Sequence, residues 1–342
     1  MNAVKAGTRA ACALTALVAG SAGAPYVEAA TTDAGSPAMA ASERCGKHGE
    51  TAVLVTGAGG PMHGEGRGSA AYLLLHEGRP AALVDLGGDV PTALARAGVD
   101  AGDIRLVLIS HLHPDHTAGL ADFLWGEMVR GRETPLTLVG PSGGERFPAL
   151  DDFLRRQFGA DGVYPFMAGL LDGEPFALDA RVVDASRKAR QEMLETEGLR
   201  IAALAVPHGS APTLAYRIDG PAFAVVFAVD QTARLESFPR FAAKADLLVA
   251  HAILHSEAAT SPLADVVALP RDLARQADAA AARHLVLGHL MGTPGEREGP
   301  WSLRSARDLA AVTRENYRGT VTLAADGQCI NIPARPGVPQ AE

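Results

Sequence analysis

Three imidazoles and a carboxylate lie within six consecutive residues, as His111, His113, Asp115 and His116. Neutral imidazoles and carboxylates are the nitrogen and oxygen ligands that zinc and similar ions take in proteins. Side chains two residues apart point to nearly opposite sides of a helix, so His111 and His113 share an ion only in a turn. Pro114 disfavours helix at His113, and Asp115 suits the start of a helix. The segment therefore predicts a metal-binding turn, with a polar loop of incidental histidines as the alternative.

Three further ligand-type residues each follow an apolar run at a distance of one or two residues: His208, Asp230 and His289. The runs are typical of strands and cover Leu199–Val206, Phe223–Val229 and His284–Leu287. The histidine-rich turn itself follows the run Ile104–Ile109. Loops at strand ends are where a rigid scaffold brings functional side chains together. We therefore expect these residues to converge on one site.

The remaining pattern predicts an α/β protein with two sheet-rich halves and helices outside them. Further strands are expected at 51–56, 70–76, 80–85, 136–139, 180–183, 214–218, 245–250 and 321–324. Helices are expected at 90–97, 117–130, 146–159, 270–282 and 303–317. The segment Val163–Glu197 is less regular, and we expect mixed loop and helix there, with the strand at 180–183 inside it.

The composition is that of a soluble globular protein able to bury a core. The chain has 342 residues, of which 47% are hydrophobic and 20% charged, and its formal net charge is −8. A nucleic-acid-binding domain is usually strongly basic, and no cluster of Lys and Arg is evident. We expect a small-molecule substrate and no nucleic acid partner.

The N-terminus has the order of a secretory signal. Lys5 and Arg9 precede the apolar stretch Ala10–Gly20, and small residues follow around Ala24 and Ala29. The stretch is too short to span a bilayer, so no stable membrane anchor is expected after cleavage. We predict a periplasmic or secreted protein with these parts: signal peptide 1–29, flexible lead-in 30–43, one folded domain 44–332 and disordered tail 333–342.

Two cysteines, Cys45 and Cys329, stand near opposite ends of the expected mature chain. In an oxidising compartment such a pair forms a disulfide that ties the termini together. Two separate buried thiols are the alternative.

The motif His-x-His-x-Asp-His, followed by distant His, Asp and His, resembles the metallo-β-lactamase superfamily. In detail the chain is similar to the branch that contains ribonuclease Z, arylsulfatase-type and cyclic-phosphodiesterase enzymes. The segments 56–61 and 83–88 follow the opening of that branch. The resemblance implies an αββα sandwich of two mixed β-sheets flanked by helices, with two metal ions at one edge.

The resemblance also implies a ligand set. The first ion would take His111, His113 and His208, the second Asp115, His116 and His289, and Asp230 would bridge both. Such a set leaves open positions for water and substrate, which is typical of catalytic rather than structural sites. Asp85 would orient a liganding imidazole from behind, or alternatively cap a turn at its strand end. Two zinc ions are expected, and the same donors accept iron or manganese.

The function implied is an exported dinuclear hydrolase whose metal-held hydroxide attacks an ester. Asp115 would assist proton transfer, and His251, with His255 and Glu257, would donate a proton on the substrate side. A phosphodiester or sulfate ester is the expected substrate. The alternatives are a lactonase or β-lactam hydrolase that attacks a carbonyl, and a non-catalytic metal-binding protein.

Two departures argue against RNA as the substrate. Transfer-RNA-processing members of the branch carry a further histidine upstream of the last ligand, where this chain has the segment 267–271 without one. They also pair a histidine with glutamate after the penultimate strand, whereas His251 is followed by Ala252.

Overall fold

The computed structural model of the chain describes residues 45–46, 50–62, 66–253, 262–291, 309 and 313–335. All of them belong to one unit, Met39–Glu342. The expected signal peptide and lead-in, His255 and Glu257, and most of the expected helix 303–317 lie outside the described residues.

The first sheet has seven strands and carries the histidine-rich turn. Its order is β14 (Cys329–Ile332), β1 (Thr51–Gly57), β2 (Ala71–His76), β3 (Arg79–Val84), β4 (Leu106–Leu108), β5 (Leu136–Pro141) and β6 (Leu178–Val183). The strands from β14 to β3 are antiparallel, and those from β3 to β6 are parallel. Therefore β3 and β4 end at the same edge of the sheet.

The second sheet also has seven strands and supplies the remaining candidates. Its order is β13 (Thr320–Leu323), β12 (His284–Gly288), β11 (Leu247–His251), β10 (Ala224–Val229), β9 (Thr213–Asp219), β8 (Leu199–Val206) and β7 (Gln191–Thr196). The strands from β10 to β13 are parallel, and β9 is antiparallel to both β8 and β10. Strands β8, β10, β11 and β12 thus all end at one edge.

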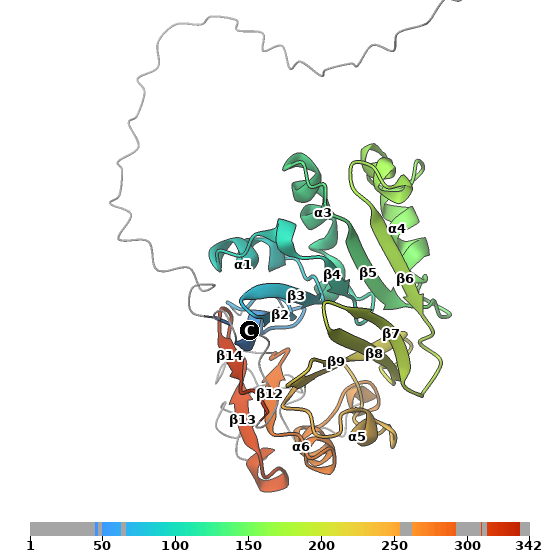
Figure 1. The fold of residues 1–342 in the computed structure, drawn as a ribbon. Coiled ribbons are helices and arrows are strands. Elements are labelled where there is room, and N and C mark those ends of the chain that lie inside the picture. Colours follow the sequence, from blue (N-terminus) through green and yellow to red (C-terminus); the bar gives the residue numbers. More distant parts are fainter. Residues whose placement is uncertain are drawn as a thin grey trace, which may run out of the picture. The chain divides into compact units, whose positions relative to one another are not determined.

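Helices cover the outer faces of both sheets (Figure 1). On the first sheet lie α1 (Val90–Arg96), α3 (Leu120–Val129) and α4 (Leu150–Phe158), and on the second α5 (Phe238–Phe241) and α6 (Pro270–Ala279). The chain also forms the single-turn helix α2 (Pro114–Thr117) and the 3-10 helices η2 (Ala101–Asp103), η3 (Pro165–Asp172) and η4 (Pro262–Asp265). The expected fold class, two mixed sheets flanked by helices, is confirmed.

Period-two alternation explains how each strand serves two apolar layers. Along β1, Val53 and Val55 belong to the cluster that includes the second sheet, whereas Ala52 and Leu54 belong to the cluster under the helices. Helix α4 buries Leu150, Leu154 and Phe158, which are four residues apart and share one face. Both faces of the strands are therefore buried, and functional groups gather where the strands end.

Two strands were not expected from the sequence. In β7 no residue is fully buried, so its apolar signal is weak, and it lies at the edge of its sheet. The edge strand β14 has four residues and follows a turn of Asp326, Gly327 and Gln328. Short edge strands of this kind bury little apolar surface, so hydrophobic periodicity identifies them poorly.

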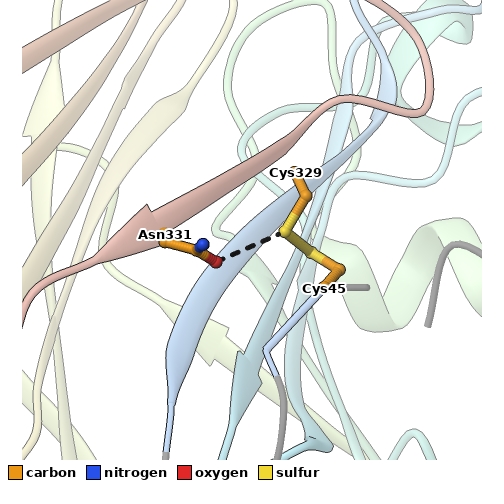
Figure 2. The surroundings of a disulfide bond; sticks show 3 residues. All are labelled: Cys45, Cys329 and Asn331. Carbon is orange, nitrogen blue, oxygen red and sulfur yellow. Dashed lines mark hydrogen bonds between the residues drawn. A yellow bond between two sulfur atoms is a disulfide. The ribbon is translucent and has the colours of Figure 1, made fainter. Parts of the chain in front are cut away.

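A disulfide joins Cys45 to Cys329 on β14, across a sequence separation of 284 residues (Figure 2). It attaches the segment before β1 to the neighbouring edge strand.

The described residues extend to Arg335, into the segment expected to be a disordered tail, and the expected boundary at Pro333 stays a prediction. The guanidinium of Arg335 pairs with the buried carboxylate of Asp246 at 2.9 Å, so the chain is anchored at least to this point. Among the described residues, no helix is both long and apolar enough to cross a bilayer.

Candidate metal centre

The predicted site residues meet at the edge where these strands end. Asp85 follows β3, the histidine-rich turn follows β4, and His208 follows β8. Asp230 and His289 follow β10 and β12 directly, and His251 is the last residue of β11. The two sheets are joined here, because Leu214 donates its backbone N–H to the carbonyl of Ser110 at 2.9 Å. The structure thus brings together candidate ligands from both halves of the chain.

One cluster consists of His111, His113, His208 and Asp230, whose ligand atoms lie within 4.8 Å of one another. The Oδ2 of Asp230 is 3.4 Å from Nε2 of His208 and 3.9 Å from Nε2 of His111. The facing ring nitrogens of His111 and His113 are 2.8 Å apart. Three imidazoles and one carboxylate are a donor set that suits zinc.

A second cluster shares Asp230 and adds His116, His251 and His289. The Oδ2 of Asp230 is also 3.9 Å from Nε2 of His116, and its Oδ1 is 3.7 Å from Nε2 of His289. Asp230 therefore lies between the two clusters. Together the clusters are consistent with a dinuclear metal site.

Asp115 lies beside the second cluster. Its Oδ2 accepts a hydrogen bond from Nε2 of His289 at 3.1 Å and is 3.5 Å from Nε2 of His116. The carboxylate thus faces two of the imidazoles with which the sequence grouped it. Asp115 and His113 are partly exposed, whereas the other members of both clusters are buried.

The outer nitrogens of three imidazoles are held by protein groups. The Nδ1 of His116 donates to Asp85 at 2.8 Å, and that of His208 donates to the carbonyl of Val266 at 2.9 Å. The Nδ1 of His111 donates to the hydroxyl of Ser110 at 2.9 Å, and this hydroxyl donates to Asp85. Such contacts fix the tautomer and direct Nε2 inward, as in metal sites. Ser110 was missed from the sequence, although its place directly before His111 was a usable signal.

Unpartnered buried nitrogens test whether the residues fit metal ions. The Nε2 atoms of His116 and His208 are buried and have no hydrogen-bond partner among the residues that the structure describes. Buried polar atoms are usually satisfied, and an orphaned nitrogen pointed at a shared carboxylate is what an ion-binding site presents. A Cβ on Gly60 would lie 2.5 Å from the ring of His289, so only glycine leaves room for that imidazole. The residues fit two ions.

Backbone conformation directs three of the site residues. A β-bulge interrupts the pairing of β10 with β11 between Phe227 and Val229, and Val229 has a positive φ of 52°. Asp85 and His289 also have positive φ, at 61° and 53°. The bulge reorients the chain so that Asp230 faces the imidazoles. A positive φ is strained for a β-branched residue, so valine is costlier here than glycine would be.

Burial and the acidic groups act in opposite directions on the metal-free imidazoles. Burial lowers the pKa of His111 well below its ordinary value and also lowers the pKa of His113. For His116, burial opposes protonation, but the charge and hydrogen bond of Asp85 outweigh it and raise the pKa to about 9. For His289, Asp230 and Asp115 likewise outweigh burial and raise the pKa.

The carboxylates show the complementary effect. Burial raises the pKa of Asp115, but the hydrogen bond from His289 and the charge of His116 lower it to about 2. Burial also raises the pKa of Asp230, yet the surrounding imidazoles, His289 first, hold it well below the usual value. Both carboxylates are therefore ionised and available to cations at neutral pH.

His251 occupies a position that the sequence did not indicate. Its side chain is 2% exposed, and its Nδ1 lies 2.5 Å from Oδ1 of Asp230. A proton donor on the substrate side must be within reach of the substrate, whereas this side chain is buried. The donor role of His251 stays a prediction from sequence.

Comparison with known proteins agrees with this geometry. A family model described as "Metallo-beta-lactamase superfamily" matches residues 64–215, which include the histidine-rich turn and His208. Ribonuclease Z from Mycobacterium bovis (strain BCG / Pasteur 1173P2) is 27% identical over 273 residues, covering 75% of this chain and 92% of that protein.

Two solved structures share the fold. The metallo-beta-lactamase fold protein YhfI from Bacillus subtilis superposes with a TM-score of 0.62 at 20% identity, covering 82% of this chain and 99% of that one. The short form of human tRNase Z also gives a TM-score of 0.62, at 22% identity and with the same coverage. The turn, the fold and these matches agree: the chain is a metallo-hydrolase with the metallo-β-lactamase fold, and it is similar to ribonuclease Z.

Proposed function

We propose that the protein hydrolyses phosphodiester bonds in small-molecule substrates. The single observation that carries the proposal is the carboxylate of Asp230, which faces the imidazoles of both clusters at 3.4–3.9 Å through one oxygen. A shared carboxylate is the arrangement that holds two ions side by side. Two such ions supply an activated water and neutralise charge on the attacking and departing oxygens of a phosphoryl group. The similarity to ribonuclease Z supports a phosphodiester over a carbonyl substrate.

We further propose that zinc is the resident metal. His111, His113 and His208 with Asp230 would hold one ion. His116, His289 and Asp115 with Asp230 would hold the other. Imidazole-rich sets with few carboxylates favour zinc over magnesium or calcium.

The charges of the described surface support a small substrate over RNA, although the ribonuclease Z relatives leave nucleic acid as a real competitor. Several exposed arginines are paired with acids and form no basic track: Arg130 with Asp100, Arg156 with Asp152, and Arg181 with Asp179. RNA binding depends on cations that are free to neutralise phosphates.

The segment 267–271 gives a second argument. Val267, Ala268 and Leu269 are buried, and Val267 and Leu269 belong to an apolar cluster with Met291. This wall beside His208 offers no proton donor in the place where transfer-RNA-processing relatives are expected to carry a histidine.

Substrate would approach from the side of His113 and Asp115, because these are the site residues that solvent reaches. The ring of Phe147 lies 5.5 Å from the ring of His113, centre to centre. An aromatic group here offers an apolar contact for an aryl or base substituent. We expect Phe147→Ala to raise KM for aryl diesters several-fold and to leave the number of bound ions unchanged.

We also propose that the protein works in an oxidising compartment outside the cytoplasm. The Cys45–Cys329 disulfide supports this, because such bonds persist mainly in secreted and periplasmic proteins. Mass spectrometry of the protein recovered from its native cells tests the proposal. We expect a mature N-terminus after Ala24 or Ala29 and no free thiol at Cys45; an intact first residue with both thiols free overturns it.

A substrate panel tests the proposed activity. Metal-depleted protein is reloaded with zinc and assayed on a bis-aryl phosphodiester, an aryl sulfate, a lactone, a β-lactam and a precursor tRNA. We expect the diester to be cleaved fastest, with activity lost on chelation and restored by zinc. Faster cleavage of any other member assigns that class instead and overturns the proposal.

Matched variants connect the activity to the site. Asp230→Asn should lose both ions and at least a thousandfold in kcat/KM, because the shared carboxylate is removed. Asp246→Asn is the control, since Asp246 is equally buried but binds Arg335 and Arg283 and not the imidazoles. It should lower thermal stability and keep both ions.

A further inference from the structure

The buried histidine that ends β11 makes the shortest contact in the centre. His251 is paired in register with Gly288, the last residue of the neighbouring strand β12, and His289 follows Gly288 directly. Its Nδ1 lies 2.5 Å from Oδ1 of Asp230, and its ring packs 4.9 Å from that of His289 and 5.8 Å from that of Tyr72, centre to centre. The side chain is therefore held in place from two sides.

The length of this contact distinguishes a hydrogen bond from shared coordination. Zinc–nitrogen and zinc–oxygen bonds of about 2.0–2.1 Å at tetrahedral angles place two ligands of one ion about 3.3 Å apart. The Oδ2 of Asp230 is 3.4–3.9 Å from the nitrogens of His208, His111 and His116, as ligands of a common ion would be. The contact with His251 is shorter than any of these and shorter than the 2.8 Å between the ring nitrogens of His111 and His113, and it matches a charge-assisted hydrogen bond.

The hydrogen bond also fixes which carboxylate oxygen faces the ions. His251 occupies Oδ1, so Oδ2 is the oxygen turned toward both clusters. Without this donor, the carboxylate could rotate about its Cβ–Cγ bond, because no other polar side chain among the described residues lies closer than 3.4 Å to its oxygens. Rotation would remove the bridging oxygen from one cluster.

We propose that His251 is a positioning residue: its Nδ1–H holds the carboxylate of Asp230 so that Oδ2 bridges the two metal positions. In this role it contacts neither the substrate nor an ion. The inference rests on the metal centre of the proposed function and is independent of which ester is cleaved.

Substitution by asparagine or glutamine distinguishes the roles of the two ring nitrogens of His251. The Nδ2 of asparagine reaches a point close to Nδ1 of histidine, whereas the longer side chain of glutamine reaches that of Nε2. His251→Asn should therefore restore the hydrogen bond to Asp230, and His251→Gln and His251→Ala should not. The matched control is Tyr72→Phe, because Tyr72 packs on the same ring and its buried hydroxyl makes no hydrogen bond among the described residues.

The test measures metal binding to the full chain, without substrate. Ions per chain after dialysis and zinc affinity by chelator competition are compared, and cobalt-substituted protein reports on coordination by its visible absorption. We expect His251→Ala and His251→Gln to weaken zinc binding 10–100-fold, the usual effect of losing a contact behind a ligand. His251→Asn should recover most of the zinc affinity and show the cobalt spectrum of the unaltered protein. Tyr72→Phe should match the unaltered protein in all three measurements.

Two results overturn the inference. If all three substitutions at His251 lose one ion equally and change the cobalt spectrum, His251 is a ligand. If all three keep both ions at full affinity and lose turnover most strongly with poor leaving groups, it is a proton donor. Failure of the protein to cleave diesters would overturn the proposed function and leave these binding results unaffected.

Discussion

The carboxylate of Asp85 is hydrogen-bonded directly to Nδ1 of His116 at 2.8 Å and, through the hydroxyl of Ser110, to His111. One buried acid thus anchors an imidazole in each cluster. It also accepts the backbone N–H of Ser110 at 2.7 Å, which fixes the start of the histidine-rich turn. The sequence left open whether Asp85 orients an imidazole or caps a turn; these contacts combine both roles.

Asp85→Asn should weaken binding of the ion at His116 about 10–100-fold, because the amide is a poorer acceptor for the imidazole N–H. Chelator competition with zinc measures the effect. Ser110→Ala, which leaves the Asp85–His116 contact intact, should cost less than Asp85→Asn at the ion near His116. Equal affinities for Asp85→Asn and the unaltered protein would contradict the anchoring role.

Metal uptake at pH 7 should release close to one proton from His116, and a further fraction from His289. Their pKa values are raised in the metal-free protein, so at pH 7 a larger fraction of each imidazole is protonated than in free histidine. Each imidazole must lose this proton to bind an ion. Affinity should rise with pH and level off near pH 9, where His116 has already lost its proton. Calorimetric titration in buffers of different ionisation enthalpy counts the protons. Zero release between pH 6 and 8 would refute the charged state of His116.

Val229→Gly should lower the free energy of unfolding by less than the truncation of a buried side chain normally does. Removing a buried valine costs about 2–3 kcal/mol, and glycine adds about 0.5–1 kcal/mol through the unfolded chain. Relief of the positive φ returns about 1–3 kcal/mol, so the net cost should centre near 1 kcal/mol and stay below about 3 kcal/mol. Val226→Gly, equally buried on the same strand, should cost about 3 kcal/mol in denaturant unfolding. Equal losses would show that the strain at Val229 is negligible.

Loss of the disulfide should destabilise the protein without changing the metal centre. The double substitution Cys45→Ser with Cys329→Ser should cost about 2–5 kcal/mol, because it removes the closure of a very long loop in the unfolded chain. Thermal melts of the double variant, and of the unaltered protein with and without reductant, measure the loss. A melting temperature unchanged by reductant would mean that the bond contributes nothing to stability.

The parts of the site that could be predicted are those identifiable from a short segment of the sequence. The spacing of His111, His113 and His116 around Pro114 leaves few other interpretations, and His208 and His289 follow clear apolar runs. The resemblance supplied Asp230 as the shared ligand, and the structure places it between the clusters.

The parts that were not predictable depend on pairing between distant strands. His251 faces Asp230 because β10 and β11 are parallel neighbours and the bulge at Val229 shifts their register, and neither fact is visible in either segment alone. Strand β7, which lacks a fully buried residue, and the four-residue β14 are formed by partners elsewhere in the chain. Their own side chains carry too little periodic signal to indicate them.

The positions of the candidate ligands and of the two cysteines along the chain determine when they can meet during biosynthesis. His111 is made early, whereas His289 and Cys329 follow only with β12 and β14. The residues that would hold the two metal positions, and the two cysteines, can therefore meet only after these later strands have been synthesised. Metal loading of the complete donor set would follow that point.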